Sequence, residues 1–352
     1  MKERTAPAVQ TRSQAVDLVK TVAICGVLMV HVTAPALTGG ETGSPPWLCA
    51  LLWACVSHMC VPLFLMTSGA LLLDPARPLT LKKLYTKNFP RLLAALLFWA
   101  VCYKLFALCL HGMTVPGLIQ AAKEVVLFRH EEHLYYLHIM LLVYAFVPIT
   151  RLVADHADRR QLEYLLGLWF LLGILYPTVR TFWPFTLLVG IPKQWLMNMT
   201  YASIGYTLLG RYITAYHARG RRPFWILSIA AGAAMAFFGC WAASMAAGQA
   251  DTHFLEGMGV PMWLLAVGIY GLCQSASIPA GLRRTAEYLS KASFCVFLTH
   301  IFFLKAFSRL GVNALMGPVA VTAPLVAALL LGCGCLVYEV LRRIPVVREY
   351  LI

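Results

Sequence analysis

Apolar residues occupy the chain in long runs, separated by short polar segments that carry most of the charge. A transmembrane helix needs about 20 mostly apolar residues, and ten runs come close to or exceed that length. They cover residues 16–37, 47–73, 91–110, 134–150, 161–177, 194–214, 224–246, 260–280, 292–310 and 318–341. No long polar segment interrupts them. The pattern predicts an all-α polytopic membrane protein with about ten transmembrane helices, in a single domain over residues 1–352.

The overall composition supports this class. The 352 residues are 60% hydrophobic and only 12% charged, whereas soluble domains average about 45–50% apolar and about 25% charged residues. An ordinary soluble enzyme, a disordered chain and a nucleic-acid-binding domain are therefore excluded. The 11 cysteines lie in or beside the apolar runs and lack the spacing of a redox or zinc site, so we expect neither disulfides nor a metal.

The basic residues predict the orientation in the membrane. The formal net charge is +14, and 22 of the 29 Lys and Arg residues fall on one side if the N-terminus is cytoplasmic. Cytoplasmic loops collect Lys and Arg, so both termini are predicted to be cytoplasmic, as segments 1–15 and 342–352. The first run contains charged residues and no cleavage site follows it, which indicates a retained helix and not a signal peptide.

The first run holds three ionisable residues, Asp17, Lys20 and His31. Lys20 and His31 are eleven residues apart, which is about three helical turns plus 20°, so both project from one face about 16 Å apart along the axis. Asp17 and Lys20, at i and i+3, can pair. Ionisable groups inside a membrane span are costly and mark functional sites by default. The alternative is structural: Lys20 is a topogenic residue that reaches the headgroups, and His31 is a packing histidine.

Two further groups of polar residues stand out. Lys83, Lys87 and Arg91 are four residues apart on a predicted helix, so they line one face that could bind phosphates or anchor the helix at lipid headgroups. Several histidines lie at membrane depth, namely His58, His130, His133, His138 and His300, and Glu339 lies late in the last run. Imidazole changes charge near neutral pH and suits proton transfer, although any single one of them is more often structural.

Four segments resemble motifs of the membrane acyltransferase-3 family, and most closely its branch that contains the enterobacterial-common-antigen O-acetyltransferase. They are Lys20 and His31 with ten residues between them, Ser68-Gly69 at the end of the second run, the block from His133 to Pro148, and the block from Ser293 to His300. The chain departs from the family pattern at three positions. Lys20 replaces an arginine, Tyr135 replaces a tryptophan, and His58 replaces a basic residue.

The resemblance implies transfer of an acyl group, usually acetyl from acetyl-CoA, across the inner membrane of a bacterium. The acceptor would be a hydroxyl of an outward-facing glycan or lipid-linked sugar. The resemblance implies roles for the following residues: Lys83, Lys87, Arg91 and Ser68 bind the donor, His31 acts as general base or acyl carrier, Asp17 holds Lys20, and His133, Tyr135 and His300 serve the acceptor side. Membrane lipids are the other expected partners.

Buried histidines and a charged pair also suit a proton-coupled transporter or exporter. A membrane protein with no catalytic role in envelope assembly is a third hypothesis, in which His31 could be replaced without loss. A binding site for coenzyme A on the cytoplasmic side would distinguish the enzyme from both alternatives.

Overall fold

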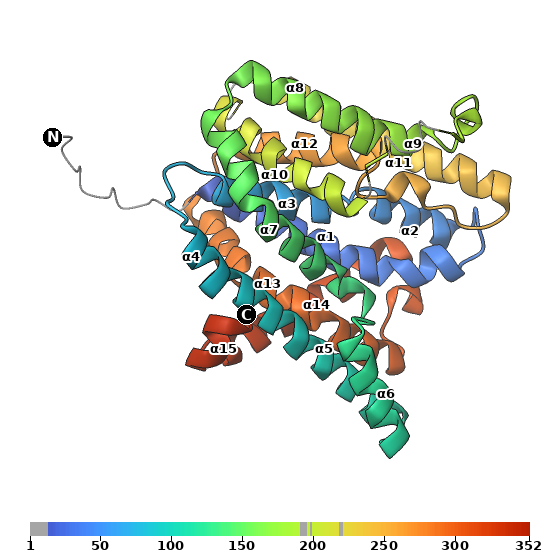
Figure 1. Cartoon of the computed structure of the whole chain (residues 1–352). Helices are drawn as coiled ribbons and strands as arrows, with labels where there is room; N and C mark the ends of the chain where they lie inside the picture. The colour runs from blue at the N-terminus through green and yellow to red at the C-terminus, as the bar shows by residue number, and fades with distance from the viewer. Residues whose placement is uncertain (1–12, 191–195, 198, 218–220) are drawn as a thin grey trace.

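A computed structural model describes residues 13–352 except 191–195, 198 and 218–220. The described residues form helices joined by turns and contain no strand (Figure 1). Among them, nine helices or runs of consecutive helices are long and apolar enough to cross a membrane. The predicted all-α polytopic membrane class is confirmed.

The long helices follow the apolar runs, because each run is long enough to place its backbone hydrogen bonds within one helix in the bilayer. In chain order the α-helices are α1 (Gln14–Gly39), α2 (Pro45–Cys55), α3 (Cys60–Leu72), α4 (Leu81–Lys83), α5 (Phe89–His111), α6 (Val115–Val126), α7 (Tyr135–His156), α8 (Arg159–Trp169), α9 (Tyr176–Val179), α10 (Met199–Tyr216), α11 (Arg222–Ala247), α12 (Val260–Gln274), α13 (Ala280–Arg309), α14 (Val319–Leu341) and α15 (Pro345–Tyr350).

Helix α1 is central to the bundle and packs against α2, α3, α12, α13 and α14. Ser13 begins α1 as its N-cap, since its side chain accepts a hydrogen bond from the Val16 amide. Apolar side chains are buried along the length of α1. A helix buried on so many sides holds its polar side chains in fixed positions, which matters for Lys20 and His31.

The second predicted span, 47–73, is not one continuous helix. It is broken at residues 56–59, between α2 and α3. The break approaches α1 closely at Gly26, where an added Cβ would lie 2.9 Å from the Ser57 carbonyl oxygen. Glycine is therefore required at this crossing. Interrupted spans place backbone and polar side chains inside a membrane protein instead of against lipid.

The run predicted at 194–214 corresponds to α10, and part of it lies outside the described residues. Helix α10 packs against α3 and α7. At the contact with α3 the two backbones approach so closely that a Cβ at Gly69 would overlap Thr207, and one at Gly210 would overlap Met66. Small residues that allow such contacts are typical of helix pairs in membranes.

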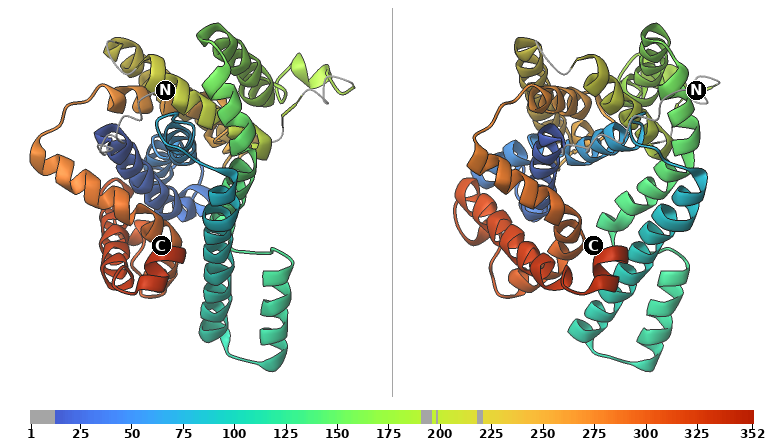
Figure 2. Two further views of the ribbon diagram at one scale, coloured as in Figure 1. Left: turned by 60° about the vertical axis from the view of Figure 1, so that its left-hand side comes forward. Right: turned by 90° about the vertical axis from the view of Figure 1, so that its left-hand side faces the viewer.

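The segment between the third and fourth predicted runs contains the helix α6. Helices α5 and α6 project side by side beyond the rest of the bundle (Figure 2). Lys104, inside the third span, donates a 2.6 Å hydrogen bond to Glu124 of α6, and this bond lowers the pKa of the Glu124 carboxyl. The charge of Lys104 is thus neutralised by a helix that the apolar pattern did not reveal.

Candidate functional site

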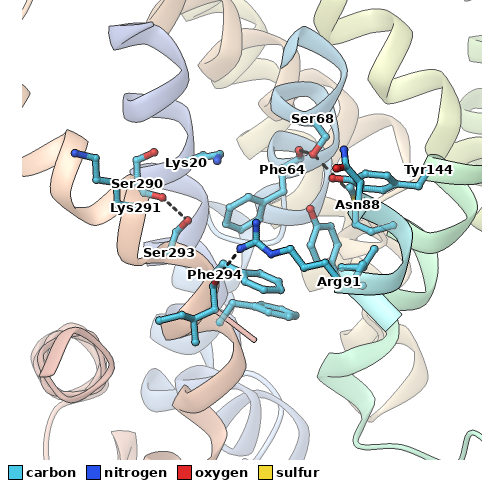
Figure 3. A pocket seen from close by; sticks show the side chains of 15 residues that line it. Lys20, Phe64, Ser68, Asn88, Arg91, Tyr144, Ser290, Lys291, Ser293 and Phe294 are labelled. Atoms are coloured by element: carbon cyan, nitrogen blue, oxygen red, sulfur yellow. Dashed lines mark hydrogen bonds between the residues drawn. The ribbon is translucent and has the colours of Figure 1, made fainter. Parts of the chain in front are cut away.

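A cavity of about 450 Å³ lies near the start of α1. Lys20 of α1, Ser68 of α3 and Arg91 of α5 all line it. Figure 3 shows the Arg91 side chain extending into this cavity, which we call the cationic cavity. Ser68 and Arg91, which the resemblance assigned to the donor, therefore meet Lys20 in one place, although Lys20 and Arg91 are 71 positions apart in the chain.

Lys83 and Lys87, predicted to share a face with Arg91, do not line the cationic cavity. Both side chains are exposed. The prediction assumed a regular α-helix, but residues Leu84–Asn88 form a π-helix, η1, between α4 and α5. Lys87 and Arg91 still contact one segment, since Lys87 pairs with Glu349 and Arg91 bonds to the Ile352 oxygen. Of the three cations, however, only Arg91 reaches the cavity.

The segment around α15, predicted as a cytoplasmic tail, packs against α5. Arg91 donates a 2.6 Å hydrogen bond from Nη2 to the backbone oxygen of Ile352, and Trp99 donates a 3.0 Å bond from its indole nitrogen to the oxygen of Leu351. Lys87 Nζ lies 3.1 Å from Glu349 Oε1. The Ile352 side chain is buried and lines the cationic cavity. The segment therefore contributes to the lining of the cavity and contacts both Lys87 and Arg91.

A second cavity of about 250 Å³ lies further along α1. His31, His58 and His133 line it, together with Tyr135 and apolar side chains that include Met258. We call it the histidine cavity. His58 projects from the break between α2 and α3, and donates from Nδ1 to the Ala54 carbonyl oxygen over 2.8 Å. The interruption of the second span is therefore what brings His58 into the site.

Three imidazole rings from distant parts of the chain are packed together beside this cavity. The ring centroids of His31 and His300 are 5.0 Å apart, those of His133 and His300 are 5.4 Å apart, and those of His31 and His133 are 6.4 Å apart. His300 donates from Nδ1 to the Phe297 carbonyl oxygen over 2.7 Å, because a carbonyl can only accept. Its Nε2 then carries a lone pair in the neutral ring.

Two nitrogens of this cluster, Nε2 of His133 and Nε2 of His300, are buried and have no hydrogen-bond partner within the described chain. Buried polar groups are nearly always paired, and an unpaired one in a native structure calls for a functional or ligand-based explanation. The cluster nonetheless contains no group of three His, Cys, Asp or Glu side chains placed to hold a metal ion, as judged over the described residues.

The two cavities meet at two aromatic side chains. Tyr136 of α7 and Phe297 of α13 line both the cationic and the histidine cavity. Lys20 and His31 lie in different cavities, although they share a helix as predicted. A cationic cavity and a cluster of imidazoles are thus joined end to end along α1 through the interior of a membrane protein.

Comparison with known families identifies the chain. The model of the acyltransferase-3 family, described as an acyltransferase domain, matches residues 13–338. The chain belongs to the acyltransferase-3 family. The match includes every residue assigned to the two cavities except Ile352. No curated protein and no solved structure matches the chain. The protein is therefore a multi-pass membrane acyltransferase by family, and the geometry of its own side chains must supply the detail.

Other residues singled out from the sequence of this acyltransferase lie outside the two cavities. Asp17 is buried but lines neither of them. His130 and His138 pair with each other, with 3.2 Å between Nδ1 and Nε2. Glu339 pairs with Arg342 over 2.6 Å. The polar groups of His130, His138 and Glu339 are thus partnered locally, away from both cavities.

The sequence analysis missed several residues of the acyltransferase site. Tyr136 and Phe297 lie within apolar runs, where aromatic residues are ordinary and carry no distinguishing signal. Ser290 lines the cationic cavity from α13, two residues before the ninth predicted run, and Ser293 lines it too but is named above only as the first residue of a family motif. Only the weak polarity of Ser290-Lys291-Ala292-Ser293 at the start of the ninth run could have indicated them.

Proposed function

We propose that this acyltransferase carries an acetyl group from acetyl-CoA on the cytoplasmic side to a hydroxyl of an outward-facing glycan or lipid-linked sugar. The observation that supports the proposal best is the meeting of the cationic cavity and the histidine cavity at Tyr136 and Phe297. A donor held by its phosphates in the first cavity could extend its thioester end toward the second. Neither a passive partner nor a carrier of protons alone needs that combination.

The cationic cavity suits the phosphates of coenzyme A. Arg91 offers a planar fork of N–H donors that matches phosphate oxygens, and Lys20 adds a second positive charge on the opposite wall. Ser68, on α3, contributes a hydroxyl to the same lining. A mixed lining of charged, hydroxyl and aromatic side chains fits a ligand that has a charged head and a flexible arm of low charge.

The histidine cavity suits the chemistry of transfer. In the proposed reaction His31 accepts the proton of the acceptor hydroxyl, and the oxygen attacks the thioester carbon. A C–O bond forms, the C–S bond breaks, and the proton passes to the departing thiolate. In the alternative route the acyl group first transfers to His31 and then to the acceptor oxygen. Both routes require His31 to be neutral when the hydroxyl or thioester arrives.

His133, Tyr135 and His300 are proposed to serve the acceptor. The unpaired Nε2 atoms of His133 and His300 can bind hydroxyl groups of a sugar. Tyr135, which is 42% exposed, stands at the rim of the histidine cavity. Within the family, the resemblance of the His31, His133 and Ser293–His300 motifs supports our proposal of the branch that acetylates glycans, and so of the inner membrane of a bacterium as the location.

The direct test is incubation of the purified protein with labelled acetyl-CoA and with membrane glycolipids, followed by mass spectrometry of the lipid fraction. We expect a mass gain of one acetyl group on a sugar-bearing lipid. Binding of coenzyme A with no acyl product on any glycolipid would contradict the proposed acceptor class. Absence of coenzyme A binding altogether would contradict the proposal.

The contacts of the α15 segment give a further prediction. Glu349→Gln removes the carboxylate that pairs with Lys87 at 3.1 Å and should strengthen donor binding, because an anionic donor then competes with one negative charge fewer. Exposed ion pairs contribute about 0.2–1 kcal/mol, so we expect the Kd for coenzyme A to fall by a factor of about 1.4 to 5. Isothermal titration calorimetry in detergent measures this Kd. Glu339→Gln, which breaks a similar pair with Arg342, should leave the Kd unchanged, and an equal effect of both variants would contradict the prediction.

A further inference from the structure

We propose that Tyr136 and Phe297 form an aromatic constriction that selects the length of the acyl group. The proposal rests on the proposed function, since it assumes that the acyl end of the donor passes from the cationic cavity to the histidine cavity. It goes further because it names the side chains that decide which acyl groups can pass. A short acyl group such as acetyl fits, and a longer chain is rejected.

The placement of the two rings supports this role. Both line the two cavities, and their centroids are 5.4 Å apart at an interplanar angle of 72°. This edge-to-face arrangement is favourable for aromatic pairs. Phe297 is 5% and Tyr136 is 9% exposed, so the surrounding helices hold both rings in place. A ligand that joins the cavities has to pass between or beside these rings.

Neighbouring groups hold the constriction next to the proposed reaction centre. The Phe297 ring lies 5.9 Å from the His133 ring, and the Phe297 carbonyl oxygen accepts the hydrogen bond from His300. On the other side, Phe64 lies 5.8 Å from Tyr136. Because α7 and α13 are long helices, the spacing of the rings is set by the packing of the bundle and not by a loop.

The physical basis is packing. Interiors are close-packed, so an added methylene must displace a ring or find a void. A hydrophobic pocket discriminates against one additional or missing methylene by about 10- to 200-fold. With Tyr136 and Phe297 in van der Waals range of the thioester end, each carbon beyond acetyl would press against a ring. Shortening one ring should open space for longer chains.

The experiment is a competition between acetyl-CoA and hexanoyl-CoA for the same acceptor, with products resolved by mass. Phe297→Leu keeps the site apolar and the fold intact, and Phe297→Ala opens more space. We expect the ratio of hexanoyl to acetyl product to rise about tenfold or more in Phe297→Leu and further in Phe297→Ala. Phe303→Leu is the matched control, since Phe303 lies on the same helix, is half-buried and lines neither cavity.

The possible results distinguish failure of the constriction proposal from failure of the proposed acyltransferase function. A product ratio unchanged in Phe297→Leu, in a protein with normal thermal stability and acetyl transfer, would overturn the constriction and leave the acyltransferase proposal standing. The same shift in Phe303→Leu would also overturn it, because general loosening of α13 would then explain the result. Absence of acyl transfer by the unaltered protein would contradict the proposed function itself.

Discussion

His31→Gln should abolish acyl transfer while the protein remains folded. A positioned general base contributes about 10²- to 10⁴-fold to the rate, and glutamine supplies hydrogen bonds but no basic lone pair. His31 lines the histidine cavity, where the acceptor is proposed to bind, and its ring lies 5.0 Å from that of His300. Initial rates of transfer from labelled acetyl-CoA measure the loss, and thermal unfolding in detergent measures the stability.

His111→Gln provides the control, because His111 is exposed at the end of α5 and lines neither cavity of the site. It should transfer acetyl at the rate of the unaltered protein. Coenzyme A binding should persist in His31→Gln, since the cation that would bind the phosphates, Arg91, belongs to the other cavity. A correctly folded His31→Gln protein with full activity would contradict the catalytic role and would leave transport or a passive role as the better hypothesis.

Arg91→Gln should weaken donor binding more than any other single change around the cationic cavity. Hydrogen bonds to charged groups contribute about 1.5–3 kcal/mol, which corresponds to a rise in Kd of about 10- to 150-fold. The wild-type affinity should fall with salt, because ions screen the attraction between phosphate and guanidinium. The salt dependence should be smaller in Arg91→Gln. Titration of coenzyme A at two salt concentrations checks both expectations.

Lys82→Gln is the matched control for Arg91→Gln. Lys82 is an exposed cation on the short helix α4, and its loss changes the net charge by the same amount. If the two variants weaken binding equally, the general positive potential of this side attracts the donor and Arg91 has no special role. If neither variant changes the Kd, the cationic cavity does not bind coenzyme A.

The features that the sequence predicted depend on local properties of the chain. The length of each apolar run predicts a membrane-spanning helix, because unpaired backbone groups are not tolerated in lipid. The helical period placed Lys20 and His31 on one face of α1, and α1 is one continuous helix over both. The motifs around Ser68, His133 and His300 were quoted from the sequence, and the family match over residues 13–338 agrees with them.

The spacing of Lys83, Lys87 and Arg91 could not show which of these cations lines a cavity. Only Arg91 does, whereas Lys87 is paired with Glu349, a residue far away in the chain. The run 47–73 was treated as one span from its apolar character, although Pro62 follows the break at residues 56–59 and has no N–H to bond to the His58 carbonyl. That local signal indicates a break, but not that His58 enters the site. The break is stabilised by its contact with α1 at Gly26, which is a contact between distant parts of the chain.

The amino-acid sequence by itself thus determined the membrane class, nearly all the spans and the chemical character of the residues available for catalysis. Tertiary structure alone decided which of them act together. His31 and His300 are far apart in the chain, yet their rings lie 5.0 Å apart, and the packing of α7 against the rest of the bundle brings Tyr136 to Phe297. The reason is physical: hydrophobic length and helical period are set by neighbouring residues, whereas a cavity exists only where several separate helices pack around the same space.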